Sequence, residues 1–352
     1  MPKPNTRNNK GAEILTQTAS QNISSNEHAT RRCPFYEGVV KTTDLAGRDL
    51  MRLLDLSLCE FQLILDTALE QKAQMKDGYV VAPFAGKSVA IIMEKPSLRT
   101  RSSFEIGVAQ LGAHPLVLAD DHSAFSRGES VKDTTMVLER YVDCIVLRTF
   151  EQSKVAEVAK WASIPVINAL SDDFHPCQGL ADALTILEHK GALRGVKVAY
   201  LGDGSNNMAN TYCELAAIAG MNLTIGAPSG HHPNPTYLEE CLALCEKTGG
   251  SITVVEDAIG AVDGADVVIT DSWTSMGADN ADEASGLFEA FQVNEELMGH
   301  AAKDAMFMHC LPAHRGHEVT DEVMDGPWSA IYDEAENRLH VQKALISLVM
   351  AQ

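Results

Sequence analysis

Short apolar runs alternate with helical patterns along the chain from Asp44 to the C-terminus. The runs are rich in β-branched residues and are bounded by polar or glycine-containing segments, which is typical of buried strands in a parallel sheet. A first series lies at residues 88–93, 115–119, 144–150 and 164–170, and a second at residues 196–202, 222–227, 251–256, 266–271 and 306–311. The pattern predicts an α/β protein with two doubly wound parallel sheets, each covered by helices on both faces.

Two further helical segments indicate how the sheets are joined. Residues 178–190 lie between the two series, and residues 335–350 carry the last helical pattern. We expect a first domain over residues 41–178, a second over residues 179–333, and a C-terminal helix within residues 334–352 that packs back on the first domain. Ligands of open α/β sheets bind at the carboxyl ends of strands, so the cleft between the domains is the expected site.

Residues 1–40 have a different composition from the rest of the chain. They are rich in Asn, Ser, Thr and Gln and show little periodicity, which predicts a flexible N-terminal extension. The segment weakly resembles an organelle transit peptide, but it is not Arg-rich, so a tail or arm is the better interpretation.

The balance of charge excludes some partners. A net charge of −20 and a pI near 4.9 argue against nucleic acid and anionic membranes, because both would repel this surface. No apolar run approaches the ~20 residues that span a bilayer. The eight cysteines form no CxxC pair, and several lie in apolar runs, which favours free thiols in a reducing, cytoplasmic setting.

The segment EKPSLRTRSSFE joins the strand at residues 88–93 to a helical pattern. Ser97 is a good N-cap, and a helix N-terminus offers unpaired N–H groups and the positive end of the helix dipole. Thr100, Arg99 and Arg101 add a hydroxyl and two guanidiniums, which suit a phosphate or another small oxyanion. The alternative is that Ser97 only caps the helix while the arginines are solvated or pair with nearby glutamates.

Other polar motifs follow predicted strands, where an open α/β sheet places its ligands. They are Arg148, the HPCQ segment at 175–178, GDGSNN at 202–207, DSWTSMG at 271–277 and HCLP at 309–312. Arg148 alone could be a strand-end salt bridge, and His175 could simply precede a proline at the first helical position. GDGSNN lacks the third glycine of GxGxxG, and no acidic residue ends the next strand, so a dinucleotide site is not favoured.

The histidines near HCLP raise the question of a metal site. His309, Cys310, His314 and His317 are suitable ligand types, but no second Cys/His pair completes a recognised spacing. A zinc site is therefore not favoured, and Cys310 as a nucleophile would need a histidine base that spacing cannot supply.

The order of the motifs, from SLRTR through HPCQ, DSWTSMG and HCLP to AENR, closely resembles the ornithine carbamoyltransferase family over residues 44–352. The resemblance implies transfer of the carbamoyl group of carbamoyl phosphate to the side-chain amine of L-ornithine, giving L-citrulline and phosphate. That reaction needs no metal and no organic cofactor. Family members form catalytic trimers, sometimes stacked further, so the resemblance also implies at least a homotrimer.

The resemblance assigns site residues by matching motifs. Carbamoyl phosphate would be bound by Ser97, Leu98, Arg99, Thr100, Arg148, His175, Gln178, Cys310, Leu311 and Arg338. Ornithine would be bound by Asn207, Asp271, Ser275 and Met276. The catalytic set would be Arg148, His175, Cys310 and Thr100, and the family commonly has a cis peptide bond at the position of Leu311–Pro312. The SMG loop is expected to close over ornithine.

Two positions depart from the family: Leu98 stands where Thr is usual, a mild change because the contact there is mainly through the backbone, and the departure at position 124 matters more. Ala124 stands where most members carry Gln or His, the residue that reaches the carbamoyl phosphate of a neighbouring subunit. Two other functions are compatible with most of these motifs. The protein could be a sister enzyme that acts on putrescine or N-acetylornithine, or a non-catalytic protein that binds carbamoyl phosphate. The direction of the reaction in metabolism is not readable from these motifs.

Overall fold

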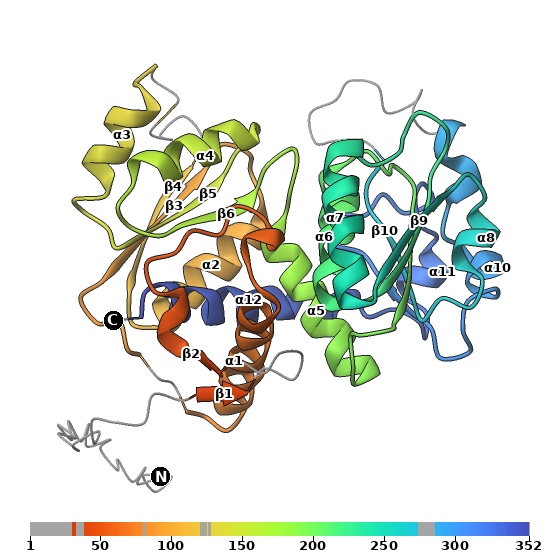
Figure 1. Cartoon of the computed structure of the whole chain (residues 1–352), viewed down its shortest axis with the longest axis horizontal. Coiled ribbons are helices and arrows are strands. Elements are labelled where there is room, and N and C mark those ends of the chain that lie inside the picture. Colours follow the sequence, from red (N-terminus) through yellow and green to blue (C-terminus); the bar gives the residue numbers. More distant parts are fainter. Residues whose placement is uncertain are drawn as a thin grey trace, which may run out of the picture.

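The computed structural model describes residues 30–32, 39–79, 82–119, 125, 128–273 and 286–351. These residues form two α/β lobes, each built on one parallel sheet (Figure 1). The predicted fold class is confirmed, and every predicted apolar run contains a strand.

The first lobe is built on a four-stranded parallel sheet with the order β4-β3-β5-β6. Its strands are β3 (Ser88–Met93), β4 (His114–Ala119), β5 (Cys144–Arg148) and β6 (Val166–Leu170). Its helices are α1 (Leu58–Lys76), α2 (Leu98–Gln110), α3 (Val131–Leu138) and α4 (Gln152–Trp161), preceded by the short η1 (Thr42–Leu45) and η2 (Leu53–Asp55).

Side chains of β3 alternate between two hydrophobic clusters, as the pleat of a strand requires. Val89 and Ile91 belong to the cluster that contains residues of α1, α2 and α12. Ala90 and Ile92 belong to the cluster formed with α3 and α4. Both faces of the sheet are therefore covered, which explains why its strands are predominantly apolar.

The second lobe is built on a five-stranded parallel sheet with the order β11-β10-β7-β8-β9. Its strands are β7 (Lys197–Leu201), β8 (Asn222–Gly226), β9 (Ser251–Val255), β10 (Val267–Thr270) and β11 (Met306–Met308). Its helices are α6 (Asn207–Ala219), α7 (Pro235–Thr248), α8 (Ala258–Val262), η4 (Glu289–Phe291), α10 (Glu295–Met298) and α11 (Asp321–Met324).

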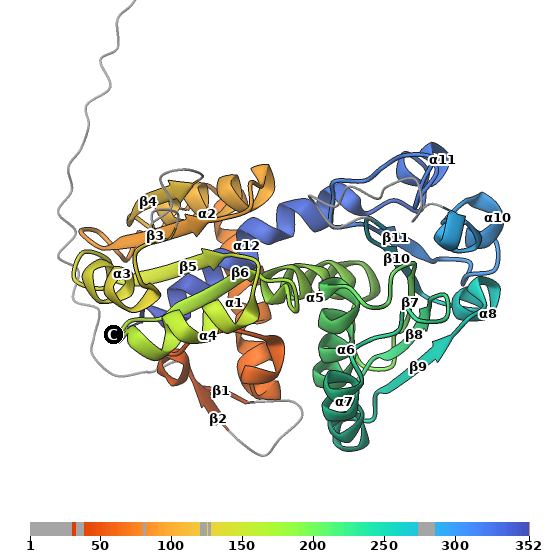
Figure 2. The same cartoon turned by 90° about the horizontal axis from the view of Figure 1, so that it is seen from above.

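Two long helices connect the lobes. Helix α5 (Pro176–Lys190) leaves the first sheet, and the last helix α12 (Ile331–Val349) returns from the second lobe. Helix α12 packs against α1, α2 and α5 (Figure 2). The start of α12 therefore reaches the second lobe, while its later turns belong to the core of the first.

Part of the predicted N-terminal extension has a described backbone. Strand β1 (Thr30–Arg32) pairs antiparallel with β2 (Val39–Lys41). Residues 1–29 and 33–38 lie outside the described residues. Cys59, which was expected to be a free thiol, is disulfide-bonded, whereas six other cysteines are free.

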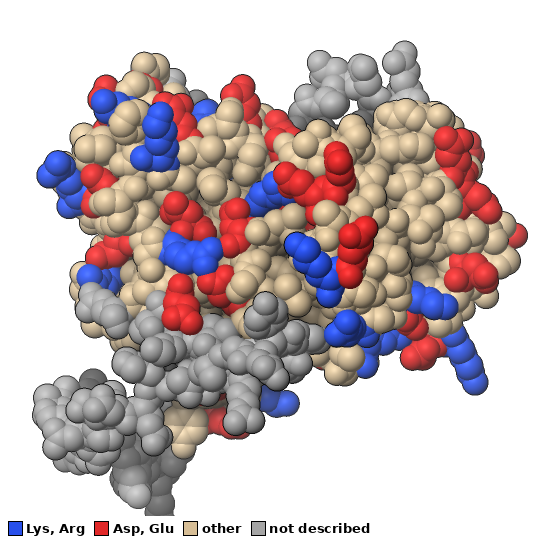
Figure 3. Space-filling model, in the orientation of Figure 1, with Lys and Arg blue, Asp and Glu red and all other residues tan. Residues whose placement is uncertain are grey.

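Acidic and basic side chains are interspersed on the face drawn in Figure 3. This distribution agrees with an acidic chain that presents no broad basic surface there. Within the described ranges, no helix combines the length and the apolar character needed to cross a bilayer.

Candidate active site

A cavity of about 270 Å³ opens between the lobes at the carboxyl ends of both sheets. The first lobe and α12 contribute Ser97, Arg99, Arg148, His175 and Arg338 to its lining, and the second lobe contributes Asn207, Asp271 and Cys310. The structure thus brings most of the predicted site residues together in one cleft. Ser275 and Met276 lie outside the described residues, as does Ala124.

The two arginines of the SLRTR segment, at the start of α2, lie in different environments. Ser97 caps the helix, since its Oγ accepts from Thr100 N at 3.3 Å. Arg99 lines the cavity, whereas Arg101 is exposed and pairs with Glu105 at 3.2 Å. The oxyanion interpretation therefore applies to Arg99, and the surface ion-pair alternative applies to Arg101.

Two buried arginines converge on one hydroxyl group. Arg148 donates from Nη1 to Thr100 Oγ1 at 3.3 Å, and Arg338 donates from Nη2 to the same atom at 2.9 Å. Their side chains are nearly inaccessible to solvent, and Nε of each has no hydrogen-bond partner in the described part of the chain. Burial and the neighbouring guanidinium of Arg338 lower the pKa of Arg148 to about 10. Buried cations without a carboxylate partner create a strong local demand for an anion.

His175 lies immediately before α5 and beside this cluster. Its backbone N–H donates to Thr211 Oγ1 at 2.9 Å, and its ring Nε2 lies 3.4 Å from Arg338 Nη1. Burial and the charge of Arg338 hold the pKa of the imidazole well below its usual range. His175 is therefore neutral near pH 7. Because Arg338 can only donate, Nε2 is the acceptor and the ring proton is on Nδ1, which has no partner among the described residues.

Gln178 extends the cluster inward from the cavity. Its Oε1 accepts from Arg338 Nη1. Its Nε2 donates to Asp182 Oδ1 at 2.8 Å and to Glu334 Oε1 at 2.9 Å. All three polar contacts are buried, so the orientation of this amide is strongly determined.

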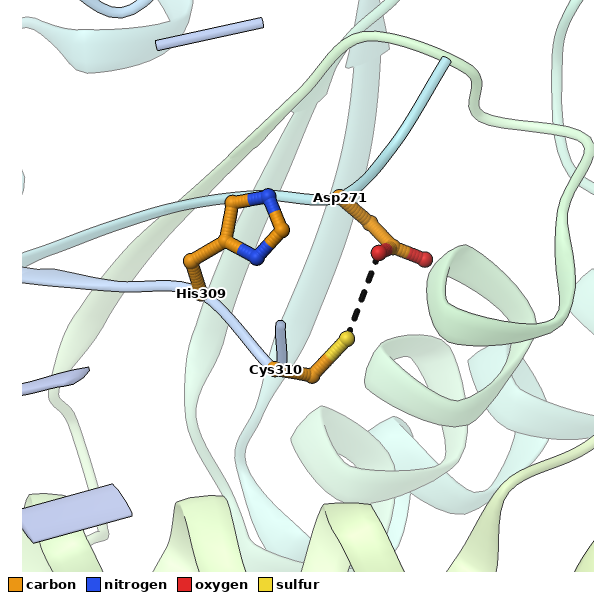
Figure 4. Close-up of side chains that lie close together, drawn as sticks. All are labelled: Asp271, His309 and Cys310. Atoms are coloured by element: carbon orange, nitrogen blue, oxygen red, sulfur yellow. Dashed lines mark hydrogen bonds between the residues drawn. The ribbon is translucent and has the colours of Figure 1, made fainter. Parts of the chain in front are cut away.

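The side of the cavity formed by the second lobe carries the negative charge. Cys310 Sγ donates to Asp271 Oδ1 at 3.2 Å (Figure 4), and Asn207 Nδ2 donates to Ser171 O at 2.7 Å. Burial and the nearby Asp271 carboxylate raise the pKa of the Cys310 thiol well above its usual range. The thiol is therefore protonated at neutral pH and is a hydrogen-bond donor rather than a base.

The HCLP segment has an unusual backbone. Leu311 has φ = +58°, and the Leu311–Pro312 peptide bond is cis, as predicted. Leu311 N donates to His309 Nδ1 at 2.9 Å. The turn follows β11 directly, so the strand ends at Met308 rather than at residue 311 as the apolar run predicted.

Asp271, His309 and Cys310 bring one ligand-type atom each within 4.8 Å of one another. His309 cannot offer a free nitrogen there, because Nδ1 accepts from Leu311 and Nε2 lies 3.3 Å from Glu318 Oε1. The Cys310 thiol is protonated as well. This arrangement fits a hydrogen-bonded turn better than a metal site.

Two charged residues in the cavity wall were missed by sequence reasoning. Lys95 and Asp172 both line the cavity and form an ion pair across its rim. Lys95 also lies over the ring of Phe150, 4.4 Å from its centroid. Each residue lies two positions after a predicted strand, at residues 88–93 and 164–170, so the strand-end rule applied to the other motifs could have found them.

The fold and the site together define a class of enzyme. Residues 48–188 match the family description "Aspartate/ornithine carbamoyltransferase, carbamoyl-P binding domain". Residues 194–349 match "Aspartate/ornithine carbamoyltransferase, Asp/Orn binding domain". The chain belongs to the aspartate/ornithine carbamoyltransferase family.

Three similar proteins are ornithine carbamoyltransferases by name. The chain is 49% identical to the enzyme of Hyperthermus butylicus over an alignment of 309 residues. That alignment covers 87% of this chain and 98% of the relative. It is 49% identical over 306 residues to that of Anoxybacillus flavithermus, with 87% and 97% covered. The solved structure of the enzyme from Pyrococcus furiosus superposes with a TM-score of 0.85 at 47% identity and covers 87% of this chain and 98% of that one.

Proposed function

We propose that this protein is an ornithine carbamoyltransferase, which transfers the carbamoyl group of carbamoyl phosphate to the side-chain amine of L-ornithine. The products are L-citrulline and phosphate. The observation that carries the proposal is the convergence of Arg99, Arg148 and Arg338 on the capped start of α2, inside a cleft whose opposite wall carries Asp271. The similarity to enzymes of that name supports the choice of acceptor.

Carbamoyl phosphate fits the cationic side of the cleft. We assign its phosphate to Ser97, Arg99, Thr100 and the backbone N–H of Leu98, because a helix N-terminus and guanidiniums suit a dianion. We assign its carbonyl and amide groups to the set Arg148, His175, Gln178, Arg338 and the backbone carbonyls of Cys310 and Leu311.

Ornithine fits the opposite side. Its α-ammonium would pair with Asp271, and its carboxylate would be bound by Asn207 and by the loop that contains Ser275 and Met276. The structure does not describe that loop, so closure over ornithine stays a prediction from the sequence.

The proposed chemistry requires donors at the carbonyl oxygen, which gains negative charge as the amine adds. Arg148, His175 and Thr100 would stabilise that charge, and donors of this kind typically contribute about 10²–10³ in rate. The attacking amine must be neutral, although a free alkylamine titrates near ~10.4. After the neutral amine has formed its bond to the carbonyl carbon, it must lose one proton as the bond to phosphate breaks. Since the Cys310 thiol is already protonated, we assign that proton to the departing phosphate.

A citrulline assay with four acceptors tests the function. Purified protein is supplied with carbamoyl phosphate and with ornithine, putrescine, N-acetylornithine or aspartate in separate reactions. We expect ornithine to be by far the best acceptor. Equal or faster turnover of another amine would reassign the enzyme to a sister activity, and absence of turnover with all four would favour a non-catalytic carbamoyl phosphate-binding role.

We also propose a homotrimer, or a multiple of it, located in the cytoplasm. The six free cysteines support a reducing compartment, and the disulfide at Cys59 is an exception to that pattern. Exposed apolar side chains on α2, Leu98 at 78% and Ile106 at 50% exposure, support burial against another subunit. Analytical ultracentrifugation tests the assembly, and a mass corresponding to a monomer would contradict it.

The domain limits at residues 41–178, 179–333 and 334–352 are part of the same proposal, as is a flexible arm over residues 1–40.

A further inference from the structure

Two buried carboxyl groups lie directly behind Gln178 and outside the cavity lining. Asp182 on α5 and Glu334 on α12 are 0% and 1% exposed. Gln178 Nε2 donates to Asp182 Oδ1 at 2.8 Å and to Glu334 Oε1 at 2.9 Å. Both N–H groups of the Gln178 amide are therefore committed to carboxyl oxygens.

These contacts determine which end of the Gln178 amide faces Arg338. A guanidinium only donates hydrogen bonds, and Arg338 Nη1 donates to Gln178 Oε1. If the Gln178 amide were rotated by half a turn, its NH₂ group would face the donors of Arg338. Its oxygen would then face the carboxyl oxygens of Asp182 and Glu334. The carbonyl oxygen of Gln178 thus faces Arg338, which lines the cavity, and retains one lone pair for a further donor.

Glu334 also contacts the turn that carries two backbone acceptors, the carbonyl groups of Cys310 and Leu311. Its Oε2 accepts from His309 N at 2.8 Å, and the His309 ring accepts from Leu311 N at 2.9 Å. Glu334 therefore ties Gln178 to the turn that carries the backbone carbonyls of Cys310 and Leu311. One side chain sets the spacing between the amide acceptor and the two backbone acceptors.

The two carboxyl groups are close enough to share a proton. They hydrogen-bond to each other, and Tyr212 donates to Asp182 Oδ2 at 2.6 Å. Burial raises the pKa of both groups, and the neighbouring Asp182 charge raises the pKa of Glu334 further, so that Glu334 holds the proton and Asp182 accepts it. Each of the four carboxyl oxygens also accepts from Gln178, Tyr212 or His309. With one shared proton, the pair carries a single negative charge, which balances Arg338.

We propose that Asp182 and Glu334 are positioning residues that make the site select a carbamoyl group over an acetyl group. The inference rests on the proposed function. A carbamoyl NH₂ offers two hydrogens to the acceptors that this pair aligns, whereas the methyl group of acetyl phosphate offers none. An analogue without N–H leaves buried acceptors unpaired, and sites built in this way discriminate strongly against it.

The test measures dissociation constants of carbamoyl phosphate, acetyl phosphate and inorganic phosphate by calorimetry on the full-length protein. In Glu334→Gln, the new NH₂ replaces one carboxyl oxygen and opposes an N–H of Gln178 or His309. We expect carbamoyl phosphate to bind about tenfold more weakly, as the loss of one well-placed hydrogen bond implies. Acetyl phosphate and inorganic phosphate should change by less than about twofold. Asp182→Asn should give the same pattern and serves if the first variant does not fold.

Thr185→Val is the matched control. Thr185 is fully buried in the same contact between α5 and α12 and accepts from Asn337 Nδ2 at 2.9 Å, but it does not bond to the carboxyl pair. It should lower stability without changing the preference for carbamoyl over acetyl phosphate. Equal weakening of all three ligands in Glu334→Gln and Asp182→Asn, or an unchanged preference, would overturn the inference.

The two proposals can fail separately. Citrulline formation by the unmodified protein tests the function, while the binding constants test the positioning pair. A protein that makes no citrulline but loses its carbamoyl preference in both variants would overturn the function and keep the inference. An unmodified protein that binds acetyl phosphate as tightly as carbamoyl phosphate would overturn the inference.

Discussion

Arg338 Nη2 donates to Thr100 Oγ1 at 2.9 Å across a sequence separation of 238 residues. The bond joins the last helix of the chain to the first turn of α2. Because Thr100 Oγ1 also accepts from Arg148, the hydroxyl hydrogen of Thr100 is left to donate to an anion. Helix α12 is therefore part of the proposed carbamoyl phosphate site as well as part of the core of the first lobe.

Arg148→Ala should lower turnover about 10²–10³-fold, the usual effect of losing one donor at a developing negative charge. Its effect on stability should be small, because the substitution removes a buried cation that is repelled by Arg338 and Arg99. Steady-state citrulline assays and urea unfolding measure the two effects. Arg101→Ala is the control, since Arg101 is exposed and pairs with Glu105 on the surface of α2. A loss of stability in Arg148→Ala that matches its loss of activity would contradict a catalytic role.

Asp271→Asn should weaken ornithine binding about 10- to 100-fold, because it removes the charge proposed to pair with the α-ammonium. Carbamoyl phosphate binding should be nearly unchanged, since Asn keeps an oxygen that can accept from the Cys310 thiol. Calorimetry with each ligand separates the two effects. Asp263→Asn, an exposed carboxylate on the same lobe, is the control. Equal weakening of both ligands would argue that Asp271 shapes the whole cleft instead.

Strand positions were predictable because parallel strands covered on both faces are predominantly apolar, as in β3, β5 and β10. The ends of elements were less predictable, since tertiary contacts decide them. Strand β11 ends at Met308 because the next backbone N–H bonds to Glu334 and not to a neighbouring strand. Helix α5 starts at Pro176, two residues before the predicted start at residue 178, because proline at the first helical position needs no N–H donor.

The strand-end motifs predicted which side chains would meet at the cleft, but not the residues that support them. Asp182 lies within one predicted helical pattern, at residues 178–190, and Glu334 directly precedes another, at residues 335–350. A single acid within the apolar segment QGLADALTIL was a signal for Asp182, since a buried charge needs a partner. Its partner lies on a distant helix and could be identified only once the packing of α5 on α12 was known.

His175 should stay neutral from about pH 8 to well below its ordinary pKa of ~6.5. Its folded-state pKa is lowered by burial and by Arg338, so its contribution to stability is complete above ~6.5 and is lost as the pH falls. NMR of the protein with labelled histidine measures this titration. A His175 resonance that titrates at or above the ordinary value would contradict a neutral imidazole at the site.

Arg52 should stabilise the contact between the lobes through a buried ion pair. It donates from Nε to Glu214, a fully buried carboxylate on α6, which also accepts from Leu53 N at 2.8 Å. Arg52→Ala leaves that carboxylate buried without its cation, which typically costs about 3–5 kcal/mol. We expect urea unfolding to show a loss in this range at neutral pH.

The penalty in Arg52→Ala should also depend on pH. Burial already raises the pKa of Glu214 to about 7, and removal of the Arg52 charge should raise it further. When the pKa of Glu214 is higher in the folded than in the unfolded state, its protonation stabilises the fold at low pH, and this stabilisation is lost as the pH rises through the folded-state pKa. The loss of stability in Arg52→Ala should therefore be smaller near about pH 5 than near about pH 8. Arg315→Ala is the control, because its partners Asp321 and Asp325 are exposed and such pairs contribute little. A penalty that is equal at both pH values would contradict the expected protonation of Glu214 in the variant.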